Sequence, residues 1–130
     1  MRGRKQIGYG RASRPRKVAG VMNGTEKEYA DRLAILKAAG KIADYWYECM
    51  TLKIGSDCRL TVDFLVMLPD GELELHECKG SFIRDDALVK LKAAADKFPL
   101  RFYLCVRQTK KQGGGWKVEE VKSDVWKEAA

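Results

Sequence analysis

The spacing of apolar residues along this chain of 130 residues predicts two helices. In "NGTEKEYADRLAILKAAGKI" they recur with the period of a helix, Asn23 or Thr25 can cap the first turn, and Gly40 can end the helix. A second stretch of helical period covers residues 85–98, and Pro99 directly after it marks its end.

Five further stretches have the apolar or alternating pattern of strands. They cover residues 42–54, 58–68, 72–79, 101–107 and 116–121. The "PDG" turn is so short that the strands on either side of it must be antiparallel. The strand–helix–strand step from residue 72 to 107 is long enough for a parallel crossover. We therefore expect an α/β fold with a mixed central β-sheet flanked by helices, in one domain over residues 23–130.

Three ionisable residues interrupt the apolar pattern of two of these strands. Side chains alternate along a strand, so Glu77 and Lys79 share the face of Leu73 and Leu75, and Asp63 lies in the nearly all-apolar stretch before the turn. Burying such charges without partners is unfavourable. Because the two strands pair across the turn, we expect Asp63 and Glu77 to converge in an oxygen-rich site suited to Mg²⁺ or Mn²⁺. A purely structural ion pair is the alternative.

The positive charge of the chain is concentrated at its N-terminus. Residues 1–20 contain seven of the 25 basic residues and no acid, so the remaining 18 basic residues equal the 18 acids. We expect residues 1–22 to be a disordered basic arm, because they lack the apolar content to fold alone. Such arms commonly contact nucleic acid phosphates through residues such as Arg11, Arg14, Arg16 and Lys17. A solubilising tail is the alternative.

The cysteines and the single histidine indicate no further site. No CxxC pair occurs among Cys49, Cys58, Cys78 and Cys105, so we do not expect a zinc site. We expect these cysteines to be reduced thiols. His76 projects to the face opposite Glu77 and is interpreted as structural. No apolar run approaches the length of a membrane span. We expect no membrane partner and no small-molecule cofactor.

The motif formed by "VDF" and "ECK", an Asp followed after thirteen residues by Glu-x-Lys, resembles that of the PD-(D/E)XK nuclease superfamily. The segments "TEKEYADRLAILKAAGKI", "TVDFLVMLPDGELELHECKG", "RDDALVKLKAAADKFP" and "GGGWKVEEV" resemble a family of small phage-encoded endonuclease-like proteins. The resemblance extends over residues 23–121. Its ordered set of helix acid, hairpin Asp, Glu-x-Lys and following helix is more specific than the spacing alone. The superfamily has Pro before the Asp, where this chain has Val62.

This resemblance implies a restriction-endonuclease-like core and a set of site residues. Asp63 and Glu77 would be metal ligands, together with the backbone carbonyl of Cys78, and Lys79 would be the catalytic lysine. An acid on the first helix completes many such sites. Glu26 is favoured because it lies seven residues before Leu33 on the inward face, and Glu28 remains open; ordinary first-turn helix charge is the alternative for both.

The implied activity is that of a Mg²⁺-dependent DNA endonuclease, with Mn²⁺ also supporting cleavage, acting on branched or replicating phage DNA. Holliday-junction resolution would require a homodimer. Arg84, Lys90 and Lys92 would join the arm in contacting phosphates, although both lysines also fit a solvated helix face. The implied location is the cytoplasm of a bacterial host. The alternatives are a non-catalytic nucleic-acid-binding accessory protein and a module whose ion pairs serve packing.

Overall fold

The computed structural model describes residues 18–80 and 85–123 of the chain. Its helices and strands follow in the order α1 (Gly24–Ala38), β1 (Asp44–Tyr47), β2 (Thr51–Gly55), β3 (Cys58–Thr61), β4 (Phe64–Met67), β5 (Leu73–Lys79), α2 (Asp85–Lys97), β6 (Arg101–Arg107), the 3-10 turn η2 (Lys110–Gln112) and β7 (Trp116–Val121). Within the described ranges, no helix is long and apolar enough to cross a membrane. Residues 1–17 of the predicted arm lie outside the described part.

Five of the strands form one mixed sheet in the order β1-β4-β5-β6-β7. β5 and β6 are parallel, and the other neighbours are antiparallel. The antiparallel pair on either side of the "PDG" turn is therefore confirmed, as is the parallel crossover through α2. Gly71 in that turn has a φ of 92°, a conformation that glycine adopts without steric cost.

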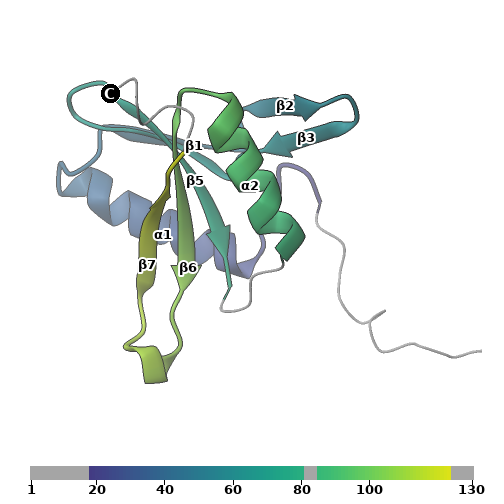
Figure 1. The fold of residues 1–130 in the computed structure, drawn as a ribbon. Helices are drawn as coiled ribbons and strands as arrows, with labels where there is room; N and C mark the ends of the chain where they lie inside the picture. The colour runs from purple at the N-terminus through teal and green to yellow at the C-terminus, as the bar shows by residue number, and fades with distance from the viewer. Residues whose placement is uncertain (1–17, 81–84, 124–130) are drawn as a thin grey trace, which may run out of the picture.

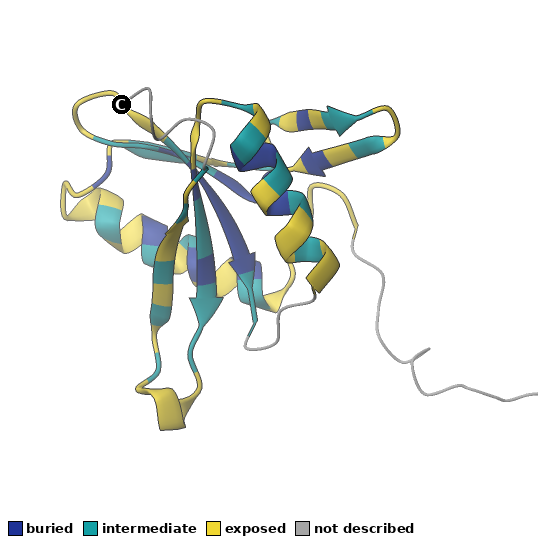
Figure 2. Cartoon of the chain, in the orientation of Figure 1, coloured by how far each residue is buried: buried dark blue, intermediate teal, exposed yellow. Residues whose placement is uncertain are grey.

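The two helices cover opposite faces of the sheet, with α1 behind it and α2 in front in Figure 1. Tyr29 and Leu33 of α1 are fully buried against Phe64, Cys78 and Cys105. This packing explains the apolar spacing of α1, whose remaining faces are exposed in Figure 2.

On the other face, α2 packs against the sheet through Leu91, Ala94 and Ala95. Their partners include Leu75 of β5 and Phe102 of β6. Alternate residues of β5 therefore face different helices, with Leu75 toward α2 and Cys78 toward α1. This alternation separates the environments of His76 and Glu77.

The predicted continuous strands over 42–54 and 58–68 are wrong, because each divides into two. β1 and β4 pair within the main sheet, whereas β2 and β3 form a separate two-stranded sheet. Two hydrogen bonds connect the pairs across the break, from the Glu48 N–H to the Asp63 carbonyl (2.9 Å) and from the Val62 N–H to the Met50 carbonyl (3.1 Å). The hairpin thus bends as a unit and sends β2 and β3 toward α2 (Figure 1).

The loop predicted between β6 and β7 also contains structure. Thr109 caps the 3-10 turn η2 by accepting a hydrogen bond from the Gln112 N–H, and the Gln112 side chain accepts one from the Thr109 N–H. The glycines that follow have positive φ, which lets the chain reverse into β7. β7 is an edge strand of the sheet, as predicted.

Candidate active site

Asp63 and Glu77 lie next to each other where the hairpin bends. The register pairs Phe64 with His76, so the residue before Phe64 faces the residue after His76. A Glu77 carboxylate oxygen accepts a hydrogen bond from the Asp63 N–H (3.3 Å), and an Asp63 oxygen accepts one from the Cys78 N–H (2.8 Å). Both acids are buried, with 7% and 8% of their surface exposed. The bend thus places two carboxylates in the protein interior.

Glu26 adds a third buried carboxylate from the first turn of α1. It forms a capping box with Asn23, whose N–H donates to a Glu26 oxygen at 3.0 Å, and the Tyr47 hydroxyl donates to the same oxygen at 2.7 Å. Only 4% of Glu26 is exposed. Glu28 instead lies at the surface in an ion pair with Arg107. Of the two acids that the sequence left open, Glu26 is the one beside Asp63.

Glu48 is a fourth acid at this place, and it was not among the residues predicted from the sequence. Carboxylate oxygens of Glu26, Glu48 and Asp63 all lie within 4.8 Å of one another. Glu48 has a φ of 47°, an uncommon conformation for a residue other than glycine, and such strain is concentrated at functional sites. The available signal was an acid within the strand-like stretch 42–54, opposite the strand that contains Asp63.

Lys79 points to the same side of β5 as Glu77. Its ammonium nitrogen lies 3.3 Å from the second carboxylate oxygen of Glu77, whose first oxygen is used by the Asp63 N–H. The Lys79 side chain is 29% exposed, so it connects the buried acids with solvent. Glu77 thus adjoins the group formed by Glu26, Glu48 and Asp63, through its hydrogen bond from the Asp63 N–H.

The electrostatics of the site disfavour its negative charges. Burial, with the charge of Glu77 second, raises the pKa of Asp63 to about 8. Burial also raises the pKa of Glu77, although Lys79 acts in the opposite direction. A divalent cation would remove this penalty, and carboxylate oxygens are the ligands that Mg²⁺ and Mn²⁺ prefer. These acids therefore fit such a cation.

Cys78 contributes to this site through its backbone. Its N–H orients Asp63, whereas its side chain is buried in the core against α1. Burial raises the pKa of the Cys78 thiol, so the side chain stays neutral and is a poor metal ligand. The predicted ligand was the Cys78 carbonyl, and that role remains a prediction.

An open pocket of about 430 Å³ adjoins Glu77 and is lined by more basic than acidic side chains. Its lining consists of Arg59, Leu60, Thr61, Glu77, Lys79, Asp86, Ala87 and Lys90. Lys90 was predicted to contact phosphates. Arg59 was missed, because its position at the pocket depends on the bend that detaches β3 from the main sheet. Lys92 lies elsewhere on α2, beside Leu88 and Val89, and Arg84 and residues 11–17 lie outside the described part.

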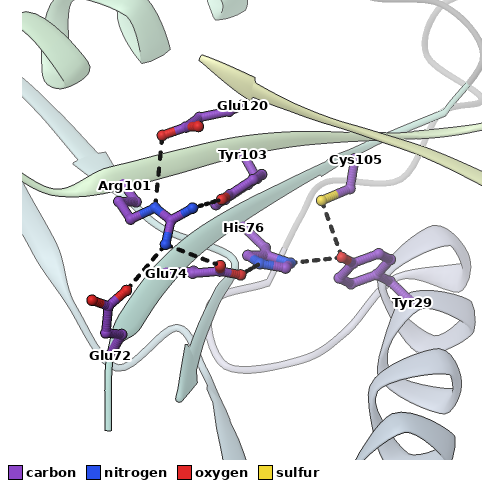
Figure 3. Close-up of polar contacts among 8 residues, drawn as sticks. All are labelled: Tyr29, Glu72, Glu74, His76, Arg101, Tyr103, Cys105 and Glu120. Atoms are coloured by element: carbon purple, nitrogen blue, oxygen red, sulfur yellow. Dashed lines mark hydrogen bonds and ion pairs between the residues drawn. The ribbon is translucent and has the colours of Figure 1, made fainter. Parts of the chain in front are cut away.

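His76 belongs to a separate chain of polar contacts on the α1 side of β5 (Figure 3). One ring nitrogen lies 3.0 Å from a Glu74 oxygen, and the other lies 2.6 Å from the Tyr29 hydroxyl. A carboxylate only accepts hydrogen bonds, so the nitrogen facing Glu74 carries a proton. In the neutral ring the other nitrogen then accepts from Tyr29, whose oxygen accepts from the Cys105 thiol (3.1 Å). This series of hydrogen bonds from Glu74 to Cys105 is complete without a ligand.

Comparison with known proteins leaves the family open. No model of a known protein family, no curated protein and no solved structure matches this chain. The resemblance to the PD-(D/E)XK nucleases therefore stays a prediction. We therefore infer the function from the geometry and electrostatics of the site.

Proposed function

We propose that this protein is a metal-dependent deoxyribonuclease with a restriction-endonuclease-like core. The observation that carries the proposal is the convergence of buried acids and Lys79 beside an open cationic pocket. In a purely structural ion pair, each acid would face a base that stabilises its negative charge. Here Asp63 has a strongly raised pKa, which is typical of catalytic and metal-binding sites.

Glu26, Glu48, Asp63 and Glu77 are the residues that would hold Mg²⁺ or Mn²⁺. When bound, such a cation polarises a phosphate and lowers the pKa of a bound water. The chain itself supplies the position of these oxygens: the α1 cap fixes Glu26, and the Cys78 N–H fixes Asp63.

Lys79 is the proposed catalytic lysine, because it pairs with Glu77 and lines the pocket. Its ammonium group can orient a water and stabilise the charge that develops on the phosphate during hydrolysis. Arg59 and Lys90 line the same pocket and would neutralise the phosphodiester that enters it.

The substrate that we propose is branched or replicating DNA, including four-way junctions of phage DNA, cut by a homodimer. This part of the proposal rests on the resemblance in sequence. The basic N-terminal arm would add phosphate contacts; in that case, removal of residues 1–20 lowers DNA affinity and its salt dependence.

The test is a cleavage assay with Mg²⁺ on nicked, flapped and four-way DNA. We expect wild type to cut at least one substrate, and Asp63→Ala and Glu77→Ala to cut at least about 10³-fold more slowly while still binding DNA. Glu28→Gln is the control, because it removes an exposed acid of α1 that lies outside the buried group, and it should cut like wild type. Absence of cleavage by wild type, or equal cleavage by the Asp63 and Glu77 variants, would contradict the proposal.

The alternative function is a non-catalytic DNA-binding accessory protein. The cations around the pocket support binding whether or not hydrolysis follows. Tight DNA binding by wild type and both alanine variants, with no cleavage in Mg²⁺ or Mn²⁺, would favour this alternative.

A further inference from the structure

The β2–β3 hairpin stands apart from the main sheet with one face fixed on α2 (Figure 1). Leu52 and Leu60, which pair across the hairpin, are buried in the core that contains Leu91. The Lys97 ammonium group also donates to the Ile54 carbonyl at 3.2 Å. The hairpin is thus held rigidly, and its opposite face is presented to solvent.

The outer face consists of two cross-strand pairs, and all four of their residues are exposed. Thr51 pairs with Thr61, and their hydroxyl oxygens lie 2.9 Å apart. Lys53 pairs with Arg59 on the next exposed rung. Asp57, in the turn, is the single acid of residues 51–61. The outer face is therefore polar and positively charged.

The pairing of Lys53 with Arg59 is unfavourable by itself. Like charges directly opposite on antiparallel strands destabilise the pair. Within residues 18–80 and 85–123, neither side chain makes an ion pair or hydrogen bond that would compensate. An anionic ligand lying across both side chains would relieve the repulsion.

The outer face leads directly into the candidate active site. Arg59 and Thr61 line the same pocket as Glu77 and Lys79, and Thr61 is separated from Asp63 by one residue. A chain of phosphates bound along the hairpin would therefore enter the pocket at its cationic side.

We propose that the outer face of the β2–β3 hairpin binds the phosphate backbone of DNA and guides it into the pocket. This inference rests on the proposed nuclease function for the direction of the DNA and names the surface that recognises it. Lysine, arginine and threonine side chains are common phosphate donors, and such contacts position DNA without reading its sequence. Double-stranded DNA is the ligand that we propose, because its dense phosphate charge, one per about 1.7 Å of helix axis, complements the paired cations of the outer face.

The test compares two double variants of the full-length protein by fluorescence anisotropy with a labelled DNA duplex, in EDTA to prevent cleavage. Lys53→Ala/Arg59→Ala removes both hairpin cations. Lys37→Ala/Lys41→Ala also removes two cations, one in the last turn of α1 and one just beyond the helix, with Lys37 about 16 Å along the helix from Glu26. All four positions are exposed, so both variants should fold, which circular dichroism checks.

We expect the hairpin variant to bind roughly 10- to 60-fold more weakly at about 0.1 M salt. Each phosphate contact releases condensed counterions from DNA, and the loss of two such contacts lowers the binding constant by about this factor. The slope of log K against log salt should fall in magnitude by about 2, and the control should match wild type within about twofold. Equal affinity and slope in the hairpin variant and the control would overturn the inference. Tighter binding to double-stranded RNA of the same length would overturn the assignment to DNA.

Cleavage by the same variants separates the two proposals. If wild type cuts DNA in an Asp63-dependent way and the hairpin variant binds and cuts equally well, the hairpin inference fails and the nuclease stands. If no variant cuts DNA but the hairpin variant alone loses affinity, the nuclease proposal fails and the hairpin remains the DNA-binding surface.

Discussion

Adjacent residues of β5 belong to two buried polar groups that differ in how well they are satisfied. His76 faces α1 and connects Tyr29 with Glu74 in an unbroken series of hydrogen bonds. Glu77 faces the other side and lies next to Asp63, with Lys79 as its ion-pair partner. Both groups interrupt the apolar core, so burial of polar atoms alone does not distinguish structure from function.

The direction of the pKa shifts does distinguish them. A hydrogen bond from His76 lowers the pKa of Glu74, so the carboxylate is favoured where it lies, and Arg101 is 3.9 Å away. Burial and Glu77 raise the pKa of Asp63 to about 8, so its charge is disfavoured. The first group is complete as it stands, whereas the second requires a cation to become stable in its charged form.

Among the variants that compare the two groups, the largest expected effect is on catalysis, from replacing Lys79 with methionine. Loss of a charge that stabilises the transition state should lower the cleavage rate constant by about 10²–10³-fold. The affinity for Mn²⁺ should be unchanged or higher, because the acids remain and a repelling cation is removed. Single-turnover cleavage and titration calorimetry measure the two quantities. Lys90→Met at the pocket wall is the control and should change mainly KM; equal rates for Lys79→Met and wild type would exclude a catalytic lysine.

The next effect is on stability as a function of pH without divalent cations. The pKa of Asp63 is about 8 in the folded protein against an ordinary 3.8, so its stabilising contribution is present below the ordinary value and is lost as pH rises through the folded value. Wild type should therefore lose up to a few kcal/mol between about pH 5 and pH 8 relative to Asp63→Asn. Urea denaturation of both proteins gives the difference, and Mn²⁺ at the upper pH should restore wild type. A pH-independent difference would show that Asp63 is charged when buried.

A smaller effect is expected when the satisfied group loses one hydroxyl. Tyr29→Phe leaves a nitrogen of buried His76 without its donor, which should lower the free energy of unfolding by about 1–3 kcal/mol. Cleavage should change by less than a few-fold. Tyr45→Phe is the matched control, because among the described residues the Tyr45 hydroxyl makes no hydrogen bond. Equal stability of the two variants would mean that the Tyr29–His76 contact contributes nothing.

The smallest effect is that of Glu74→Gln, and its pH dependence should have the opposite sign to that of Asp63. The lowered pKa of Glu74 means that its contribution is present above its ordinary value of 4.5 and is lost as pH falls through the folded value. Because Glu74 is partly exposed, we expect less than about 1 kcal/mol near neutral pH. Chemical denaturation at neutral and acidic pH measures it, with exposed Glu119→Gln as control. If the stability difference between wild type and Glu74→Gln instead grew as pH falls, the charged form of Glu74 would not be the stabilising one.

The part of the site formed within the β4–β5 hairpin was predictable from the sequence. A tight turn fixes the register of its strands, so the alternation of side chains places Asp63 near Glu77 and His76 on the opposite face. Helical spacing likewise predicted that Glu26, rather than Glu28, faces inward, and the burial of Glu26 agrees.

The bend of the longer hairpin was not predictable, and Glu48 and Arg59 were missed with it. The stretches 42–54 and 58–68 keep a strand pattern throughout. Their β2 and β3 parts are also half-buried strands, but they are buried against α2 and not within the main sheet. Tertiary packing decides where such a strand divides. Because of the bend, Glu48 of the first stretch lies beside Asp63 and Arg59 of the second lines the pocket.

Titration calorimetry of Mn²⁺ near pH 8 tests the central claim, that the acids around Asp63 form a divalent-cation site, most directly. We predict saturable binding by wild type, at least about tenfold weaker binding by Asp63→Asn and Glu26→Gln, and unchanged binding by Glu28→Gln. No binding by wild type at millimolar Mn²⁺, or equal binding by Asp63→Asn, would contradict it.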